Sequence, residues 1–266
     1  MSARQPSLIA RWLPPLLLVA LLLGLWELAA QTGWIADALS LRDYLVPAPS
    51  EIATTLWDNR SLLAENAWVT LREVLLGFAV ALVAGVLIAV LLHLSPLMRR
   101  ASYPFIVASQ AIPIVVIAPV LVVWFGFGIG PKVAIVALIC FFPIVVNTLD
   151  GLGTADEEQR KLMRSLGASR GRTLTLLEAP TALPYLLSGA KIAVAVAVIG
   201  AVFGEWSGAD AGLGYLIRLD DGNLEVARVF ASTVILAAMA VTLFALLALV
   251  ERRLAWWGAG SPGGGR

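Results

Sequence analysis

The chain has 266 residues, of which 59% are hydrophobic and only 14% are charged, and its mean hydropathy is +0.87. A water-soluble domain of this length carries far fewer apolar residues, so the composition excludes that class and indicates an integral membrane protein. The net charge of +1 identifies no partner and gives no reason to expect a nucleic acid, because in a membrane protein the positions of the charges matter more than their sum.

The first apolar run, residues 13–30, is long enough to cross the bilayer, since about 20 helical residues span roughly 30 Å of hydrocarbon. Arg4 and Arg11 precede it, so a cleaved secretory signal is the alternative. The run exceeds the usual signal core, however, and the nearest small-x-small site, at 36–38, lies well past its end. Glu27 lies inside the run, and its burial requires a partner that the sequence does not reveal.

Residues 31–68 are polar and turn-rich, with weak helical amphipathicity from 51 to 65, and are expected to lie outside the bilayer core. Further runs of spanning length follow at residues 74–94, 103–124, 133–149, 185–203 and 229–250. These segments predict an all-α membrane protein with about six transmembrane helices. The segment between the last two runs reads as a turn or a short re-entrant element.

Cys140 and His93 are the only residues of their types, so one chain cannot assemble a disulfide framework, a Cys/His metal cluster or a Cys–His catalytic pair. Both lie in apolar surroundings and are expected to have plain packing roles. The glycine-rich C-terminal tail, residues 255–266, is expected to be disordered.

The distribution of basic residues predicts the orientation in the membrane. Loops on the outer side hold only Arg42, Arg60, Lys132, Arg218 and Arg228. Loops on the other side collect Arg4, Arg11, Arg99, Arg100, Arg160, Lys161, Arg164, Arg170, Arg172, Arg252, Arg253 and Arg266. Both termini and the charged segment 150–178 are therefore predicted to be cytoplasmic.

Two short helices with a sharp corner are expected in this cytoplasmic segment. Thr154 is a good N-cap with Glu157 three residues on, which is the capping-box pattern, and Gly167 suits the left-handed position that closes the first helix. That helix carries a narrow apolar stripe, formed by Leu162, Met163 and Leu166. The stripe favours a partner surface, and the alternative is an ordinary solvated loop whose stripe packs on its own helix ends.

Ser169 is expected to cap the second helix, and Pro180 and Pro184 are expected to end it and lead the chain into the membrane. The spacing across this loop resembles the signature loop of binding-protein-dependent ABC importer permeases, Glu-Ala-Ala, three residues, Gly, nine residues, Ile-x-Leu-Pro. Gly167 stands at the glycine, and Pro180 closes the pattern at the expected spacing. The lettering differs elsewhere: residues 161–163 read Lys-Leu-Met in place of Glu-Ala-Ala, and Leu177 and Ala179 replace the Ile and Leu.

Other stretches resemble one subgroup of these permeases, which transports aliphatic sulfonates, taurine, nitrate or the hydroxymethylpyrimidine precursor of thiamine. The similarity covers nearly the whole chain from about Asn66, and its clearest stretches are 70–78, 110–113, 118–119, 124–126, 164–169, 179–185 and 204–217. Residues 199–206 and 211–215 look most like the pyrimidine-precursor permeases. The resemblance therefore implies that precursor as the best candidate substrate, with sulfonate, taurine or nitrate as the others.

The resemblance implies a type I ABC importer permease fold in a bacterial inner membrane. It also implies three kinds of protein partner: a second copy of the chain, cytoplasmic ABC ATPase subunits and an external substrate-binding protein. No lysine of this chain follows a glycine, so it cannot form a P-loop and is not expected to be an enzyme. No cofactor is expected in this chain, because ATP and Mg²⁺ would be bound by the partner ATPase.

Three regions follow from this reading: an N-terminal transmembrane helix and external segment at 1–66, a permease core at 67–254 with its coupling loop at 150–184, and the tail. The resemblance assigns ATPase coupling to Arg164, Ser165, Leu166, Gly167, Ala168, Ser169 and Pro180. Residues that a lipid-facing helix tolerates poorly suggest a translocation path of Gln110, Pro113, Phe142, Asn147 and Glu205. The alternative for these five is a role in helix packing.

Two other function classes compete with this reading. A self-sufficient secondary transporter or channel is the first, but the hydropathy shows no inverted repeat and the spans carry no run of acidic residues. A membrane enzyme is the second, and the single histidine leaves it without an evident catalytic constellation.

Overall fold

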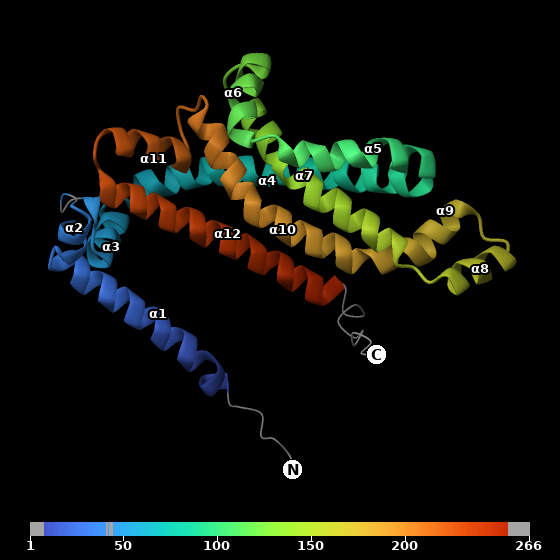
Figure 1. The fold of residues 1–266 in the computed structure, drawn as a ribbon, viewed down its shortest axis with the longest axis horizontal. Coiled ribbons are helices and arrows are strands. Elements are labelled where there is room, and N and C mark those ends of the chain that lie inside the picture. Colours follow the sequence, from blue (N-terminus) through green and yellow to red (C-terminus); the bar gives the residue numbers. More distant parts are fainter. Residues whose placement is uncertain (1–7, 41, 43–44, 255–266) are drawn as a thin grey trace, which may run out of the picture. The chain divides into compact units, whose positions relative to one another are not determined.

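The computed structural model describes residues 8–40, 42 and 45–254, and within these ranges the chain is helical throughout, without a β-strand. The expected disorder of 255–266 concerns residues outside these ranges. In chain order (Figure 1) the helices are α1 Leu8–Gln31, α2 Trp34–Leu39, α3 Pro49–Asp58, α4 Arg60–Leu94, α5 Pro96–Ala108, α6 Ile114–Phe125, α7 Ile129–Gly153, α8 Glu157–Ser165, α9 Arg170–Thr173, α10 Ala179–Trp206, α11 Leu213–Gly222 and α12 Val226–Leu254. A 3-10 turn, η2, covers Ser109–Ala111, and a π-helical turn, η3, covers Leu174–Glu178.

Five segments of the described chain are long and apolar enough to cross a membrane: Leu13–Gln31, Arg60–Leu94, Ile129–Gly153, Arg170–Trp206 and Val226–Leu254. A sixth arises if α5 with η2 and α6 are counted as one span, although the two halves are bent by 101°. The all-α membrane fold is confirmed, and the structure supports five or six spans.

The run at 103–124, predicted to be one of about six spans, is a bent pair of helices in the structure and not one continuous helix. Ile112 has an extended backbone (φ −83°, ψ 117°) and Pro113 caps the start of α6. A residue before proline is pushed out of the helical region, and proline itself has no N–H to continue the ladder. An apolar run alone therefore overestimates the continuity of this span.

Two compact units can be distinguished within the chain. The first contains residues up to Ala64 together with Leu216–Val234. Within it α1 packs against α2 and α3, and the Trp26 and Phe230 rings lie 6.0 Å apart. The Glu27 carboxylate, which lacked a partner in the sequence, accepts hydrogen bonds from the backbone N–H (2.9 Å) and the hydroxyl (2.6 Å) of Ser50. It thereby satisfies the first turn of α3, where N–H groups have no helical acceptor.

The second unit contains Glu65–Tyr215 and the chain from Ile235 onward. Helices α7 and α10 pack along each other through much of their length (Figure 1). Glycines permit the close approach: a Cβ on Gly151 would lie 2.6 Å from Tyr185 Cβ, and one on Gly189 would lie 2.6 Å from the Pro143 carbonyl oxygen. Small residues serve this purpose in membrane helices, where packing rather than water exclusion drives association.

Candidate functional site

The cytoplasmic loop begins with an N-cap that differs from the predicted one. Asp156 caps α8, and its Oδ1 accepts a hydrogen bond from the N–H of Glu158 at 2.8 Å. Thr154 instead belongs to the end of α7, where its hydroxyl donates to the Gly151 carbonyl at 2.7 Å. The predicted capping box is wrong because α7 extends to Gly153 and uses Thr154 for its own termination.

The turn at Gly167 closes α8 as the sequence predicts. Gly167 has φ +75°, its N–H donates to the Arg164 carbonyl at 3.0 Å, and the N–H of Ala168 donates to the Met163 carbonyl at 2.9 Å. This pairing satisfies the last carbonyls of the helix with a left-handed residue, for which glycine carries the smallest penalty. The Ser169 hydroxyl then caps α9 by accepting from the N–H of Arg172, which confirms its predicted role.

The corner of the loop presents an apolar surface. Leu162 is 58% exposed and Leu166 is 75% exposed. Exposed side chains surround them at Arg164, Ser165 and Ser169, and Ala168 is half-buried. No atom lies within 4 Å of a Cβ built on Gly167, so the chain itself leaves that side of the turn open. Met163, the third residue of the stripe, is half-buried, whereas the two leucines do not pack on the chain's own helix ends.

The expectation that Pro180 and Pro184 end the second helix is wrong. The chain continues as one helical segment from α9 through the π-helical turn η3 into α10. Pro180 is exposed in the first turn of α10, and Pro184 lies inside that helix. Proline is tolerated near a helix start because the absent N–H is not needed there.

A buried ion cluster lies behind the loop and was missed in the sequence. His93 Nε2, at the end of α4, lies 2.9 Å from Glu178 Oε2, and Arg160 Nε of α8 lies 2.8 Å from Glu178 Oε1. The prediction of a plain packing role for His93 is therefore wrong. The signal that was available is Glu178 itself, an acidic residue set between apolar neighbours where the loop enters the membrane.

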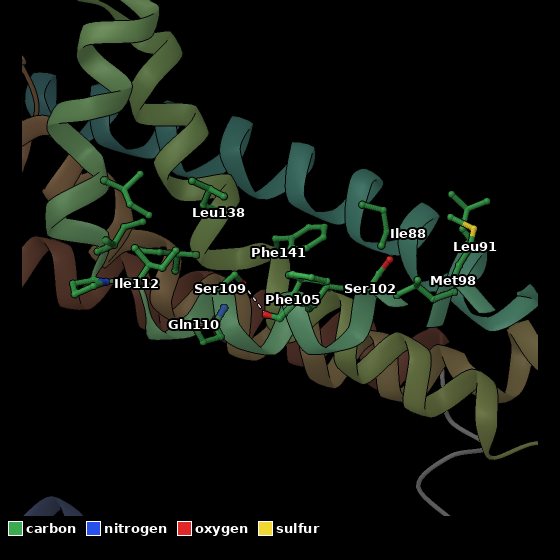
Figure 2. Close-up of a pocket in the computed structure, with 16 residues that line it drawn as sticks. Ile88, Leu91, Met98, Ser102, Phe105, Ser109, Gln110, Ile112, Leu138 and Phe141 are labelled. Atoms are coloured by element: carbon green, nitrogen blue, oxygen red, sulfur yellow. Dashed lines mark hydrogen bonds between the residues drawn. The ribbon is translucent and has the colours of Figure 1, made fainter. Parts of the chain in front are cut away.

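A cavity of about 760 Å³ lies between α4, α5, α6 and α7 (Figure 2). Its wall is mainly apolar, with Leu91, Phe105, Ile112, Leu138 and Phe141 among the lining residues. Polar groups enter it from Ser102, Ser109 and Gln110, and the Ser109 hydroxyl donates to the Ile106 carbonyl at 2.7 Å. An apolar cavity of this volume with a few polar groups is typical of a small-molecule site.

The structure separates the five residues suggested for a translocation path. Gln110 and Pro113 line the cavity at the break between α5 and α6. Asn147 lies elsewhere, where α7 meets α10: its Nδ2 donates to the Pro143 carbonyl at 2.7 Å, and a Cβ on Gly189 would lie 2.7 Å from its Cβ. Phe142, on α7, is half-buried.

Glu205 lies in a buried polar network at one end of α10. Its Oε1 accepts from the Thr70 hydroxyl at 2.7 Å, and its Oε2 accepts from the backbone N–H groups of Gly214 and Tyr215. These contacts favour a structural role, and a place for Glu205 in a path stays a prediction.

A second buried ion pair belongs to the same helices. Lys132 Nζ of α7 lies 2.9 Å from Glu73 Oε1 of α4, and both side chains are almost fully buried. A Cβ on Gly204, the residue before Glu205, would lie 3.2 Å from the Cα of Lys132. The charge distribution placed Lys132 among the outer-loop charges, and only the fold reveals that its ammonium group is paired with a buried carboxylate.

Comparison with known proteins gives the family. Residues 81–256 match the family described as "Binding-protein-dependent transport system inner membrane component". The chain is 37% identical over 246 residues to the formylaminopyrimidine transport permease protein ThiX of Halalkalibacterium halodurans, covering 92% of this chain and 96% of that protein. It is 35% identical over 218 residues to the riboflavin transport system permease protein RibX of Chloroflexus aurantiacus, covering 81% of each.

The fold also resembles a solved structure. A chain of the MetNI methionine ABC transporter in an inward-facing conformation matches with a TM-score of 0.65 and 19% identity, over 74% of this chain and 98% of that one. At this identity the match supports the fold alone.

Proposed function

This chain belongs to the binding-protein-dependent transport system inner membrane components, and on that premise we propose that it carries a pyrimidine precursor of thiamine into the cytoplasm. It is a multi-pass membrane protein and the permease subunit of an ABC importer of small solutes. It is not an enzyme, because ATP hydrolysis in such importers takes place in separate subunits.

The substrate proposal depends on two observations. The relative that is 37% identical over almost the whole chain is named for formylaminopyrimidine transport. The stretches 199–206 and 211–215 also resemble the pyrimidine-precursor permeases. A relative named for riboflavin transport is nearly as similar over a shorter region, so riboflavin is the second candidate.

The coupling proposal assigns the corner of the cytoplasmic loop, residues 164–169, to contact with the ATPase subunit, which would bind ATP and Mg²⁺. The observation that carries it is the exposed apolar pair Leu162 and Leu166 beside the open turn at Gly167. Exposed leucines of this size at a membrane protein's aqueous face indicate a surface covered by another protein. Pro180 would support this surface from the start of α10.

The path proposal assigns substrate passage to the cavity beside Gln110 and Pro113. Its volume, about 760 Å³, suits a small solute, and Gln110 supplies an amide that can both donate and accept hydrogen bonds. Phe142, Asn147 and Glu205 remain proposed members of the path in another conformation of the importer.

The assembly we propose has two copies of this chain, two ATPase subunits and one external binding protein in a bacterial inner membrane. Both termini and the coupling loop at 150–184 face the cytoplasm, in agreement with the distribution of basic residues. Residues 67–254 form the permease core of each copy.

Purification of this chain from its native cells in mild detergent, with mass spectrometry of the proteins that accompany it, tests the proposal. An ATPase subunit with a P-loop at equal stoichiometry is expected. The binding protein of the same system is then titrated with aminopyrimidines, riboflavin, sulfonates and nitrate, and tight binding of a pyrimidine is expected. A chain that purifies only with itself contradicts the proposed assembly, and a binding protein that prefers another solute contradicts the proposed substrate.

A further inference from the structure

Glu178 connects the coupling loop to the membrane helices through two side chains, His93 and Arg160, that come from different parts of the chain. His93 reaches it from the end of α4, with Nε2 2.9 Å from Oε2, and Arg160 reaches it from α8, with Nε 2.8 Å from Oε1. The side chains of His93 and Glu178 are mostly buried, and that of Arg160 is about one-fifth exposed. One carboxylate thus contacts both a transmembrane helix and the loop helix.

Arg160 adds a further connection. Its Nη2 donates a hydrogen bond to the carbonyl oxygen of Leu152, in the last turn of α7, at 2.8 Å. The contact with Glu178 is therefore an ion pair, while the well-aligned hydrogen bond of the guanidinium goes to α7. Through Arg160 the loop helix α8 is fixed to the end of α7 and to Glu178 simultaneously, which restricts its rotation about the short connections at either end.

The backbone around Glu178 is unusual. Leu174–Glu178 form the π-helical turn η3, which joins α9 to α10 in one helical segment. A π-helical turn contains more residues per turn than an α-helix, so it rotates the side chains that follow, and such turns occur mostly at functional sites. Here Glu178 points inward and is buried, while Leu176 is 68% exposed.

The charges around the cluster make Glu178 difficult to replace. A small pocket of about 250 Å³ beside it is lined by His93, Arg160, Arg164 and Arg170 as well as by Glu178. Among the residues that line this pocket, Glu178 is the only acidic one. Without its charge, three guanidinium groups and an imidazole line the same pocket with no carboxylate among them, so the repulsion between the guanidinium groups is no longer offset.

We propose that Glu178 is a positioning residue for energy coupling, because it fixes the loop helix α8 to the cytoplasmic end of α4 and orients Arg160, which reaches the end of α7. The contacts of Glu178 with Arg160 and His93 are called the Glu178 joint below. When the ATPase subunit displaces the loop, this joint transmits the displacement to the two transmembrane helices. Loss of the joint leaves the loop able to bind the ATPase but unable to move the helices with it. The inference rests on the proposed function, since it requires an ATPase partner on the loop.

The first test uses this chain alone and needs no partner. Spin labels on Leu162→Cys and Leu176→Cys, both at exposed positions, report the distance between α8 and the π-helical turn by pulsed electron paramagnetic resonance. Cys140 is buried and is replaced by serine for this purpose. A narrow distance distribution is expected with Glu178, and a distribution at least twice as broad with Glu178→Gln. Equal widths would overturn the proposed joint, even if the importer assignment is correct.

The second test uses the whole importer in liposomes and measures substrate transported per ATP hydrolysed. Glu178→Gln is expected to lower this ratio at least tenfold while the complex still assembles and hydrolyses ATP. Arg160→Gln in the same chain is expected to add little, since both changes break one joint. His93→Lys, which keeps a nitrogen donor within reach of Glu178, is expected to retain most coupling.

The control is Glu251→Gln, because Glu251 is another partly buried carboxylate, 24% exposed, whose partners Lys191 and Ser188 both lie on α10 and not in the loop. It is expected to leave the ratio unchanged. A Glu178→Gln complex with a normal ratio, or a Glu251→Gln complex with the same loss, would overturn the positioning role. Failure of the wild-type chain to bind any ATPase would instead contradict the proposed function. The distance measurement would still show whether Glu178 restrains α8.

Discussion

Replacing Glu205 by alanine and by glutamine tests whether its buried carboxylate fixes the segment that follows α10. The carboxylate accepts hydrogen bonds from the Thr70 hydroxyl and from the backbone N–H groups of Gly214 and Tyr215. A buried donor left without its acceptor costs about 1–3 kcal/mol. The Thr70 hydroxyl can turn to the Asn66 carbonyl, but the two backbone N–H groups lose their acceptor, so Glu205→Ala is expected to lower the free energy of unfolding by on the order of 4 kcal/mol.

Glutamine should behave differently because it has the same shape. Its amide oxygen can take the place of Oε2 and accept from both backbone N–H groups, and its amide nitrogen then faces the Thr70 hydroxyl. Thr70 can accept that bond, since its own hydroxyl also contacts the Asn66 carbonyl at 3.2 Å. No donor loses its acceptor, so Glu205→Gln is expected to cost only about 1 kcal/mol, the difference between a charge-assisted bond and a neutral one.

The chain provides its own reporter for this comparison. Cys140 is the only cysteine and its side chain is fully buried, so a thiol-reactive fluorescent dye reacts with it only as the chain unfolds on heating. At about 2–4 °C per kcal/mol, the alanine variant should unfold on the order of 10 °C below the glutamine variant. Ile192→Ala, at a half-exposed position of α10, serves as the control. Equal midpoints for the alanine and glutamine variants would refute the hydrogen-bond argument.

Three further substitutions test other features. Gly167→Arg forces an arginine to φ +75° and fills the open side of the loop turn. The chain should still insert into the membrane, but substrate-stimulated ATP hydrolysis should vanish in the assembled complex, and normal stimulation would contradict the docking role. Gly189→Leu should separate α7 from α10 and lower the dye-detected midpoint by several degrees, whereas Gly24→Leu, with no atom within 4 Å of the added Cβ, should not. Glu27→Leu should speed hydrogen exchange of the first α3 amides roughly fivefold, since Ser50 loses its acceptor and a cap contributes about 1 kcal/mol; unchanged exchange would contradict the capping role.

Local patterns in the sequence were sufficient for features that depend on neighbouring residues. Runs of apolar residues located the long spans, because length and hydropathy are properties of one segment. The positive φ of Gly167 and the cap at Ser169 follow from local backbone chemistry, and both predictions are confirmed. The apolar stripe that includes Leu162 and Leu166 was predicted to favour contact with a partner surface, and both leucine side chains are exposed.

Features that depend on distant residues were not predictable in the same way. The cap at Thr154 failed because the end of α7 decides which residue is free to cap α8. The partners of His93 and Glu27 lie 85 and 23 residues away along the chain, and a single sequence gives no sign of which polar groups the fold brings together. The break at Pro113 was visible as a proline, but its bend of 101° depends on how the two halves pack.

The break between α5 and α6 has a consequence for where this part of the chain can lie. Together the two helices have the length and hydropathy of one span, yet Ile112 is extended and Pro113 has no N–H. Carbonyl groups freed at such a break have no helical donor, and acyl chains offer none, at a cost of several kcal/mol for each group. The break between α5 and α6 is therefore poorly suited to contact with lipid, and water or another protein surface must cover it. A chain inserted singly into the bilayer is accordingly incomplete at this place, which favours assembly before the importer can work.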